Sequence, residues 1–274
     1  MNINKFLLII IIIVLTGCKK DDLDLPNENC INNSFFSEYS SRNFDMGFST
    51  WPYAQTIESV DNTYDFISNN ADIYSEQIDY KIPWNAWMND LPLPIEFTND
   101  ITARVTRKIP NKKLTVSVSL LNIERNDLAF DYDGTVPSYI AINDIQIEDA
   151  YFKHVQYITN QLSPDYLIIA MEVNELMKNK PEKWEAYKLL MDNVKTRILQ
   201  EFPSISISES ITLHNLYEPD VPNPEIYIDE LVNYANTMDF VSISFYPYFK
   251  GLDTYEGFQN AFDFLHDKIN QPIA

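Results

Sequence analysis

One stretch of the sequence is an almost unbroken apolar run that ends in acidic and amide side chains. Residues 164–175 read PDYLIIAMEVNE. A parallel strand that is buried on both faces has such a continuous apolar sequence, rather than an alternating one. In a barrel of alternating strands and helices, the carboxyl ends of the strands are where active sites are built. The run therefore predicts a buried parallel strand that places Glu172, Asn174 and Glu175 at a functional surface.

From Phe44 onward, β-type runs alternate with helical patterns of apolar residues. Residues 271–274, QPIA, are typical of the first residues of a further strand. We predict an α/β fold of the (β/α)8 TIM-barrel type, incomplete, with about six β/α units and the start of strand 7. A doubly wound open sheet is the competing architecture, but its ligand loops usually carry glycine-rich turns, and the chain has only 5 Gly. The strands are predicted at residues 44–49, 71–76, 113–120, 166–174, 204–208 and 240–248.

The N-terminal residues have the pattern of a bacterial export signal. Lys5 precedes an apolar run from Phe6 to Leu15, which is short for a membrane span and suits a secretory h-region. Leu15-Thr16-Gly17-Cys18 resembles a lipobox, and this resemblance implies cleavage before Cys18 and lipidation of its thiol. A chance cysteine after a plain signal peptide is the alternative. We predict a signal peptide over 1–17, an acylated tether over 18–43 and a partial barrel domain over 44–274.

The residues after Cys18 bear on location. Lys19-Lys20-Asp21-Asp22 is similar to the signals that send Bacteroidetes lipoproteins to the cell surface. The expected location is therefore the outer membrane, through the lipid anchor, at the cell surface or in the periplasm. Cys30 has no partner for a disulfide if Cys18 is acylated.

Charge and motif content limit the ligands. The chain has 40 acidic and 20 basic residues, a formal net charge of −20, which argues against nucleic-acid binding. This balance suits a neutral ligand such as a glycan. No spacing of His, Cys and acidic residues indicates a metal site, and no cofactor motif is present in the sequence. We therefore expect no cofactor and no metal.

Three segments resemble clan A glycoside hydrolases, and family 53 endo-β-1,4-galactanases in particular. Residues 170–174, AMEVN, are similar to the end of that family's fourth strand, Gly-Asn-Glu-Ile-Asn. Residues 239–248, DFVSISFYPY, resemble its sixth strand, and residues 271–274 resemble the lead-in to the seventh. The resemblance implies that Glu172 is the general acid/base of a retaining hydrolase. It places the nucleophile on the seventh strand, where this chain has no candidate.

Retaining hydrolysis needs one carboxylic acid and a second carboxylate about 5–5.5 Å away. Glu172 fits the acid position, and Glu175 is the alternative acid. The non-catalytic interpretation of Glu172 is a solvated glutamate at the start of a helix. Strand alternation predicts that Glu172 and Asn174 share a face that Glu175 does not. Glu209, after the fifth strand, is a further acid near a strand end.

Met171 departs from the family pattern, which has Asn there to hold the substrate 2-hydroxyl. A thioether cannot donate that hydrogen bond. An amide at Asn174 or Asn122 is the candidate replacement.

Aromatic side chains that follow strands are candidate walls for sugar subsites, because sugar C–H groups stack on aromatic faces. The alternative is that each of them packs a loop onto the barrel. His214, at the end of the fifth strand, is a candidate ligand contact. The candidate substrate-binding residues are Trp51, Trp84, Trp87, Asn174, His214, Tyr246 and Tyr248.

Three hypotheses remain open from the sequence: a surface-anchored glycoside hydrolase, a non-catalytic glycan-binding lipoprotein on a degenerate barrel, and a structural surface antigen. For the chain as given, we expect no hydrolysis, because a nucleophile is missing. A barrel without its last strands leaves unpaired edges, so we also expect poor solubility or oligomerisation.

Overall fold

The computed structural model describes residues 42–274, and Asp45–Ala274 forms one compact unit. The predicted signal peptide, Cys18, Cys30 and most of the predicted tether lie outside the described residues. No helix within residues 42–274 is long and apolar enough to cross a membrane.

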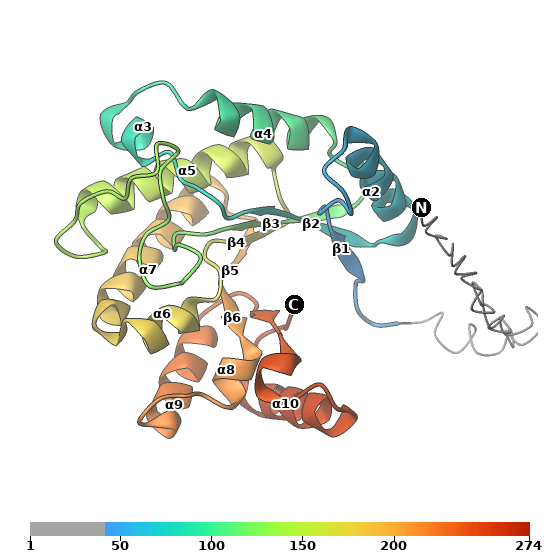
Figure 1. Cartoon of the computed structure of the whole chain (residues 1–274), viewed down its shortest axis with the longest axis vertical. Helices are drawn as coiled ribbons and strands as arrows, with labels where there is room; N and C mark the ends of the chain where they lie inside the picture. The colour runs from blue at the N-terminus through green and yellow to red at the C-terminus, as the bar shows by residue number, and fades with distance from the viewer. Residues whose placement is uncertain (1–41) are drawn as a thin grey trace, which may run out of the picture. The chain divides into compact units, whose positions relative to one another are not determined.

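The described chain alternates parallel strands and helices, as the sequence predicted (Figure 1). Strands β1 to β5 form one parallel sheet in sequence order, and β6 pairs with β7. The strands are β1 (Gly47–Ser49), β2 (Ile73–Ile78), β3 (Lys113–Val118), β4 (Tyr166–Ile168), β5 (Ser206–Ser208), β6 (Ser210–Thr212) and β7 (Ser242–Ser244). The α-helices are α2 (Ile57–Asn70), α3 (Trp84–Asn89), α4 (Ile95–Thr106), α5 (Ile145–Leu162), α6 (Val173–Asn179), α7 (Trp184–Glu201), α8 (Leu213–Tyr217), α9 (Pro224–Ala235) and α10 (Tyr255–Lys268). Two 3₁₀ turns, η2 (Pro181–Lys183) and η3 (Pro247–Lys250), complete the elements.

The two sheets join at Glu209, the single residue between β5 and β6. The ladder to the preceding strand continues across this residue, because Ile169 N–H donates to the Ser208 carbonyl at 2.8 Å and Ser210 N–H donates to the Ala170 carbonyl at 2.9 Å. Glu209 is therefore a local irregularity within one continuous sixfold array of strands. The segment 271–274 pairs in parallel with β7 through Val241 and Ile273, which confirms the predicted start of a seventh strand.

The two faces of the sheet differ in chemistry. The strand register aligns Ser75, Thr115, Tyr166 and Ser206 in one row of the inner face, and each of these side chains carries a hydroxyl group. The adjacent row on the other face consists of Glu76, Val116, Leu167 and Ile207. This second face is covered by helices, so it is the apolar side of the barrel wall.

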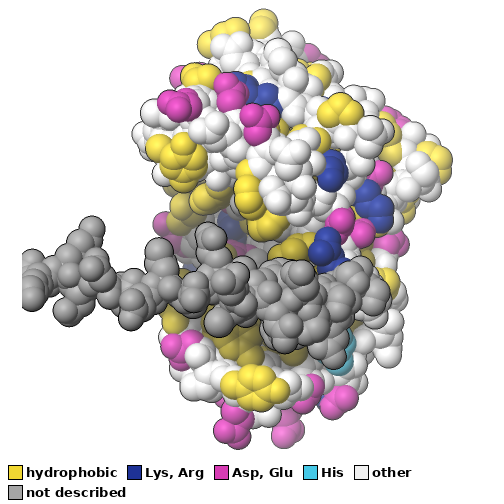
Figure 2. Space-filling model, turned by 90° about the vertical axis from the view of Figure 1, so that its right-hand side faces the viewer, with side chains coloured by type: hydrophobic (Ala, Val, Ile, Leu, Met, Phe, Trp, Pro, Cys, Tyr) yellow, Lys and Arg dark blue, Asp and Glu magenta, His cyan; other side chains and the backbone are white. Residues whose placement is uncertain are grey.

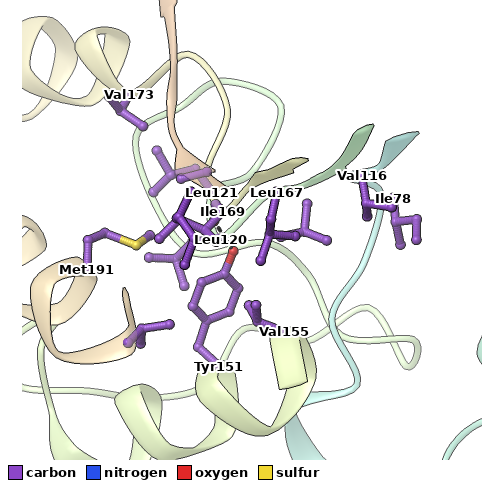
Figure 3. Close-up of a cluster of buried hydrophobic side chains, with 14 of the residues drawn as sticks. Ile78, Val116, Leu120, Leu121, Tyr151, Val155, Leu167, Ile169, Val173 and Met191 are labelled. Atoms are coloured by element: carbon purple, nitrogen blue, oxygen red, sulfur yellow. Dashed lines mark hydrogen bonds between the residues drawn. The ribbon is translucent and has the colours of Figure 1, made fainter. Parts of the chain in front are cut away.

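The core lies between the outer face of β3–β5 and helices α5 and α7 (Figure 3). Val155 and Met191 reach this layer from α5 and α7, and both are fully or almost fully buried. Tyr151 lies in the middle of it, and its hydroxyl donates to the Ile169 carbonyl at 2.5 Å. Each large side chain buried here contributes about 1.5–3 kcal/mol, so this layer holds the strand ends in place.

The ends of two predicted strands differ from expectation. β4 ends at Ile168, and α6 begins at Val173, although residues 164–175 predicted one long strand. Similarly, β7 ends at Ser244 and is followed by a 3₁₀ turn from Pro247. The carboxyl ends of these strands turn into loops and helices at the point where the predicted site residues begin.

Candidate functional site

Glu172 lies in the loop between β4 and α6, directly before the first residue of that helix. Its backbone is left-handed, with φ 55° and ψ 45°, a conformation that is uncommon for a residue with a side chain. The Glu172 N–H donates to the Ser210 hydroxyl at 2.8 Å, which ties this loop to β6. Such a strained position persists only where neighbouring contacts hold it, and it is a marker for a functional site.

Both carboxylate oxygens of Glu172 have partners. Arg125 Nε donates to Oε2 at 3.1 Å, and the Tyr246 hydroxyl donates to Oε1 at 3.0 Å. The Glu172 side chain is 15% exposed and the Arg125 side chain 8%, so this ion pair is largely shielded from water. The Glu172 charge together with burial raises the pKa of Tyr246, with burial as the larger cause.

Arg125 comes from the long segment between β3 and α5, and the sequence does not single this residue out. Its backbone is also left-handed, with φ 50°. Its Nη1 donates to the Asn122 carbonyl at 3.0 Å, which fixes the guanidinium beside Glu172. A single arginine in a polar loop gives no sequence signal for such a pairing, because only the fold brings residues 125 and 172 together.

A cavity of about 350 Å³ opens beside Glu172. Its lining combines three lysine or arginine side chains with four carboxylates and the aromatic rings of His214, Tyr246 and Phe249. The charged residues are Glu124, Arg125, Glu172, Glu175, Lys178, Asp220 and Lys250. Several of them form pairs across the opening, such as Lys250 with Asp220. The cavity can therefore offer both donors and acceptors to a polar neutral ligand.

Glu175, the alternative acid, also lines this cavity, but its carboxylate is held by neighbours. Asn215 Nδ2 donates to Oε1 at 2.6 Å, the Thr212 hydroxyl donates to the same oxygen, and Lys178 Nζ lies 3.8 Å from Oε2. The expected separation of Glu172 and Glu175 onto opposite strand faces is wrong. The strand has already ended, and Glu175 lies in the first turn of α6, so both glutamates reach one cavity.

Asn174 does not line the cavity. It is completely buried, its Nδ2 donates to the Thr212 hydroxyl at 2.9 Å, and its Oδ1 accepts from Thr212 N–H at 2.8 Å. Asn122 likewise caps its own loop, since its Oδ1 accepts from Asn126 N–H at 3.1 Å. Neither amide takes the place of the asparagine that Met171 replaces. The side chain that contacts the Met171 sulfur is Gln77 of β2, whose Nε2 lies 3.7 Å from it.

His214 lies at the start of α8 and lines the cavity, and it is only 4% exposed. Its Nδ1 is buried without a partner in the described residues. Burial lowers the pKa of His214, so the imidazole is neutral at pH 7. The ring contacts Tyr246, with 5.7 Å between centroids at an interplanar angle of 78°. His214 and Tyr246 thus lie side by side at the cavity, as the sequence proposed for the strand ends.

The remaining aromatic candidates are not gathered at Glu172. Trp84 is 1% exposed and donates from Nε1 to the Ala129 carbonyl at 2.7 Å, so it belongs to the core. Trp87 packs on Phe97 and donates from Nε1 to His154 Nδ1 at 3.3 Å. These two tryptophans follow the end of β2 but belong to α3, which packs on α5, so that Trp84 is buried and Trp87 is half-buried.

Trp51 and Tyr248 are exposed. Trp51 is 65% exposed and lines a different cavity at the ends of β1 and β2. Tyr248 is 63% exposed and contacts the Phe249 ring in a tilted arrangement, with 4.4 Å between ring centroids, and it does not line the Glu172 cavity.

Glu209 faces away from the cavity, toward the helices. The Tyr187 and Tyr234 hydroxyls donate to its two oxygens at 2.5 and 2.6 Å. Burial raises the pKa of Glu209 to about 7, although both tyrosine hydrogen bonds act in the opposite direction. Its place in the helix-facing layer removes it from the candidates for the second catalytic carboxylate. No group of His, Cys, Asp and Glu side chains in residues 42–274 has the arrangement of a metal site.

No protein-family model and no curated protein matches the sequence. Solved structures do match in fold. The GH53 catalytic domain of Ignisphaera aggregans gives a TM-score of 0.53 at 13% identity, covering 88% of this chain and 64% of that one. GH5_18 from Streptomyces cattleya in complex with GlcNAc gives 0.50 at 9% identity, covering 71% of this chain and 47% of that one. The exo-β-1,4-mannosidase Op5Man5 from Opitutaceae bacterium strain TAV5 gives 0.50 at 9% identity, covering 72% and 37%.

These likenesses establish the fold: an α/β array of the TIM-barrel type found in clan A glycoside hydrolases. The chain spans less than two thirds of each of these three structures. An incomplete barrel is consistent with this partial coverage. At identities of 13% and below, the likeness extends to the path of the backbone and not to the chemistry of the site.

Proposed function

We propose that the Glu172 cavity binds a neutral β-linked glycan and that Glu172 is the general acid/base residue of a retaining glycoside hydrolase site. The observation that carries this proposal is the left-handed Glu172 at the mouth of the barrel, with its carboxylate fixed by Arg125 and Tyr246 beside the cavity. The barrel fold shared with glycoside hydrolases supports it as an analogy.

The roles of the neighbouring residues follow from their contacts. Tyr246 and His214 present a hydroxyl and a neutral imidazole at the cavity, and both groups can exchange hydrogen bonds with sugar hydroxyls. Arg125 acts as a positioning residue, since it holds the Glu172 carboxylate. As a general acid, Glu172 would protonate the departing glycosidic oxygen, and the same carboxylate would then deprotonate the attacking water.

Retaining chemistry also needs a carboxylate that attacks the anomeric carbon. Within residues 42–274, the other carboxylate nearest in sequence at this cavity is Glu175, which Thr212, Asn215 and Lys178 engage. Its Oε1 accepts from both Thr212 and Asn215, whereas its Oε2 faces only the Lys178 ammonium among the described residues, at 3.8 Å. The nucleophile is not assigned to any described residue.

Non-catalytic glycan binding is the second candidate function. One observation favours it: both oxygens of Glu172 already have donors, so the carboxylate has to exchange a partner before it can reach a glycosidic oxygen. In this case the cavity would hold a sugar, and no bond would be broken.

The two functions are separated by binding and turnover measurements with β-1,4-linked galacto-, manno- and gluco-oligosaccharides. We expect binding, and replacement of Glu172 by Gln, which keeps the size and one acceptor, should leave it within about threefold. Any turnover by the chain should fall at least a hundredfold in Glu172→Gln. Glu175→Gln is the matched control; if it alone removes turnover, the acid role moves to Glu175. Binding without turnover in the unsubstituted chain would establish the non-catalytic function.

The membrane anchor is a separate proposal. Cys18 lies outside the described residues, and the lipobox-like sequence around it supports acylation and placement in the outer membrane at the cell surface or in the periplasm. Expression in a bacterium with labelled palmitate should give a labelled membrane protein, and Cys18→Ala should remove the label. A wild-type chain without label would show that residues 1–17 act as a plain signal or not at all.

A further inference from the structure

A second and larger cavity, of about 690 Å³, lies away from Glu172. Its walls are α2, which follows β1, and α4, which follows α3. Its rim includes the exposed side chains of Trp51 and Tyr80. We call it the α2–α4 groove. Figure 2 turns the side carrying α2 toward the reader and shows hydrophobic, acidic and basic side chains scattered over the visible surface.

The base of the groove is a charged cluster on the outer face of β2. Glu76 is 1% exposed and occupies a row of otherwise apolar residues. Its Oε1 accepts from the Tyr64 hydroxyl of α2 at 2.5 Å and its Oε2 accepts from the Thr50 hydroxyl at 2.8 Å. Arg104 of α4 completes the cluster with an ion pair to the same carboxylate. A buried charge of this kind is stable only when it is fully paired, and here the pairing links both helices to the sheet.

Arg104 connects this cluster to the open groove. Its Nε donates to Asp100 Oδ2 at 2.9 Å, and its Nη1 contacts Glu76. Its Nη2 has no hydrogen-bond acceptor among the described residues, and the side chain is 21% exposed in the groove wall. The guanidinium is thus held rigidly by two carboxylates and keeps a pair of N–H groups for a ligand.

The rim supplies flat apolar surface. Trp51 is 65% exposed and Tyr80 is 75% exposed, and both lie on loops that follow strands. Lys81 lies next to Tyr80, with Nζ 5.0 Å from the ring centroid. The side chains that line the groove, which do not include the buried Glu76, comprise three acidic and three basic residues, so the lining carries no excess charge in a chain of net charge −20. A neutral saccharide chain suits this lining, which has exposed aromatic faces, fixed planar donors and no excess charge. An anionic polymer or a strongly charged peptide fits such a lining poorly.

The inner end of the groove approaches the first site. Gln77, which lines the groove, lies on the opposite face of β2 from Glu76 and contacts the Met171 sulfur, one residue before Glu172. A chain molecule lying in the groove therefore points toward the Glu172 loop. Occupation of the groove would raise the local concentration of the same polymer at the Glu172 cavity.

From this geometry we infer that the α2–α4 groove is a second binding site for a neutral glycan chain, with Trp51 as the stacking platform and Arg104 as the hydrogen-bond donor at its base. The inference rests on the proposed function only for the class of ligand. Its residues are separate from those of the Glu172 cavity.

Tryptophan emission provides a local probe of the groove. Of the 4 Trp in the chain, Trp51 is the exposed one, Trp84 and Trp184 are at most 3% exposed, and Trp87 is half-buried where it packs against the core. We would titrate the full chain with β-1,4-linked galacto-, manno- and cellohexaose, and follow both emission and heat. Stacking of a sugar ring on Trp51 should change the emission and reduce its quenching by acrylamide.

The variants separate the two sites. Trp51→Ala should weaken hexasaccharide affinity about tenfold, whereas Trp51→Phe should keep most of the affinity and lose the emission change. Tyr53→Ala is the matched control, because Tyr53 is 76% exposed nearby but does not line the groove. Glu172→Gln should retain the emission change, since that residue belongs to the other cavity.

Each outcome of these titrations either supports or overturns the groove inference. If hexasaccharide affinity depends on Tyr246, or turnover depends on Glu172, but affinity is unchanged in Trp51→Ala, the groove inference is overturned and the proposed function stands. If affinity depends on Trp51 but no variant of the Glu172 cavity alters binding or turnover, the groove stands and the proposed function fails. No binding of any of the three hexasaccharides at millimolar concentration overturns both.

Discussion

Glu172 and Glu209 follow neighbouring strands of the barrel, yet they lie in different surroundings. Glu172 lies at a cavity and has Arg125 as a cationic partner. The Glu209 carboxylate faces the helices, and its hydrogen-bond donors within residues 42–274 are the hydroxyls of Tyr187 and Tyr234. Arg125 compensates the charge of the Glu172 carboxylate at the cavity. The Glu209 carboxylate is hydrogen-bonded by two tyrosine hydroxyls instead, and burial raises its pKa to about 7.

The comparison shows that two glutamates at neighbouring strand ends have different roles, one at the candidate functional site and one in packing. A glutamate at a strand end is a candidate catalytic acid only if the backbone turns it toward the mouth of the barrel. At Glu172 a left-handed backbone does so, and at Glu209 the single-residue interruption between β5 and β6 directs the side chain to α7 and α9. The same division separates the tryptophans, since Trp51 is exposed and Trp84 is buried.

The largest expected effect concerns those tryptophans. Trp84→Ala should lower the free energy of unfolding by about 3–5 kcal/mol, because it leaves a cavity in the core and an unpaired Ala129 carbonyl. Trp51→Ala should change it by about 0.5 kcal/mol or less. Urea unfolding followed by circular dichroism compares the two, and equal losses would contradict the division into core and groove.

The next effect is the pH dependence that Glu209 imposes. Its pKa is about 7 in the folded chain and 4.5 for an unperturbed glutamate, so the folded state binds the proton more tightly. The contribution of this group is therefore fully present below pH 4.5, falls as the pH rises to 7, and changes no further above it. The loss amounts to about 3 kcal/mol.

Glu209→Gln isolates this effect from the other carboxylates. The variant should show a flatter dependence of unfolding free energy on pH between 5 and 8 than the unsubstituted chain. The groups facing Glu209 are Tyr187, Tyr234 and Tyr151, with Lys195 as a more distant cation. Parallel pH curves for the two proteins would show that Glu209 is ionised in the folded chain at all these pH values.

A smaller loss is expected at the Glu172 ion pair. Arg125→Met keeps the length of the side chain but leaves a largely shielded carboxylate without its cation, so stability at pH 7 should fall by about 2 kcal/mol. Arg107→Met is the control, because Arg107 pairs with an exposed Asp61 and should contribute less than about 1 kcal/mol. Thermal melts at pH 5 and pH 7 measure both. If Arg125→Met costs no more than its control, the pair does not hold Glu172 in place.

The smallest effect is that of the Tyr246 hydroxyl. Tyr246→Phe removes one hydrogen bond to Glu172, which should cost about 1 kcal/mol. Tyr248→Phe, at a neighbouring exposed ring, should leave stability unchanged within measurement error. A double-mutant cycle of Tyr246→Phe with Glu172→Gln should then show coupling, and additive losses would place the two groups out of contact.

Two sequence predictions remain open. Poor solubility or oligomerisation was expected from unpaired strand edges, and light scattering of the purified chain tests it. The absence of hydrolysis by this chain was expected from the missing nucleophile, and the oligosaccharide assays test it.

The sequence by itself determined the fold class, the order of strands and helices and the start of a seventh strand. Apolar periodicity decides these features, because it reports which residues can be buried in a local element. It also placed Glu172, Glu175, His214 and Tyr246 at strand ends, and they line one cavity.

Only the tertiary structure decided which of these side chains meet and which way each one faces. The pairing of Arg125 with Glu172 joins two loops that are 47 residues apart, and no local pattern encodes it. The burial of Asn174 and Trp84 follows from the turn into α6 and from the folding of α3 onto α5, and a strand-alternation rule does not anticipate either. The groove between α2 and α4 depends in the same way on Glu76, a charge in an apolar row, whose partners come from three separate segments. The periodicity of apolar residues determines which side chains are buried in the core. The direction of a side chain at a strand end depends instead on the backbone conformation after the strand has ended.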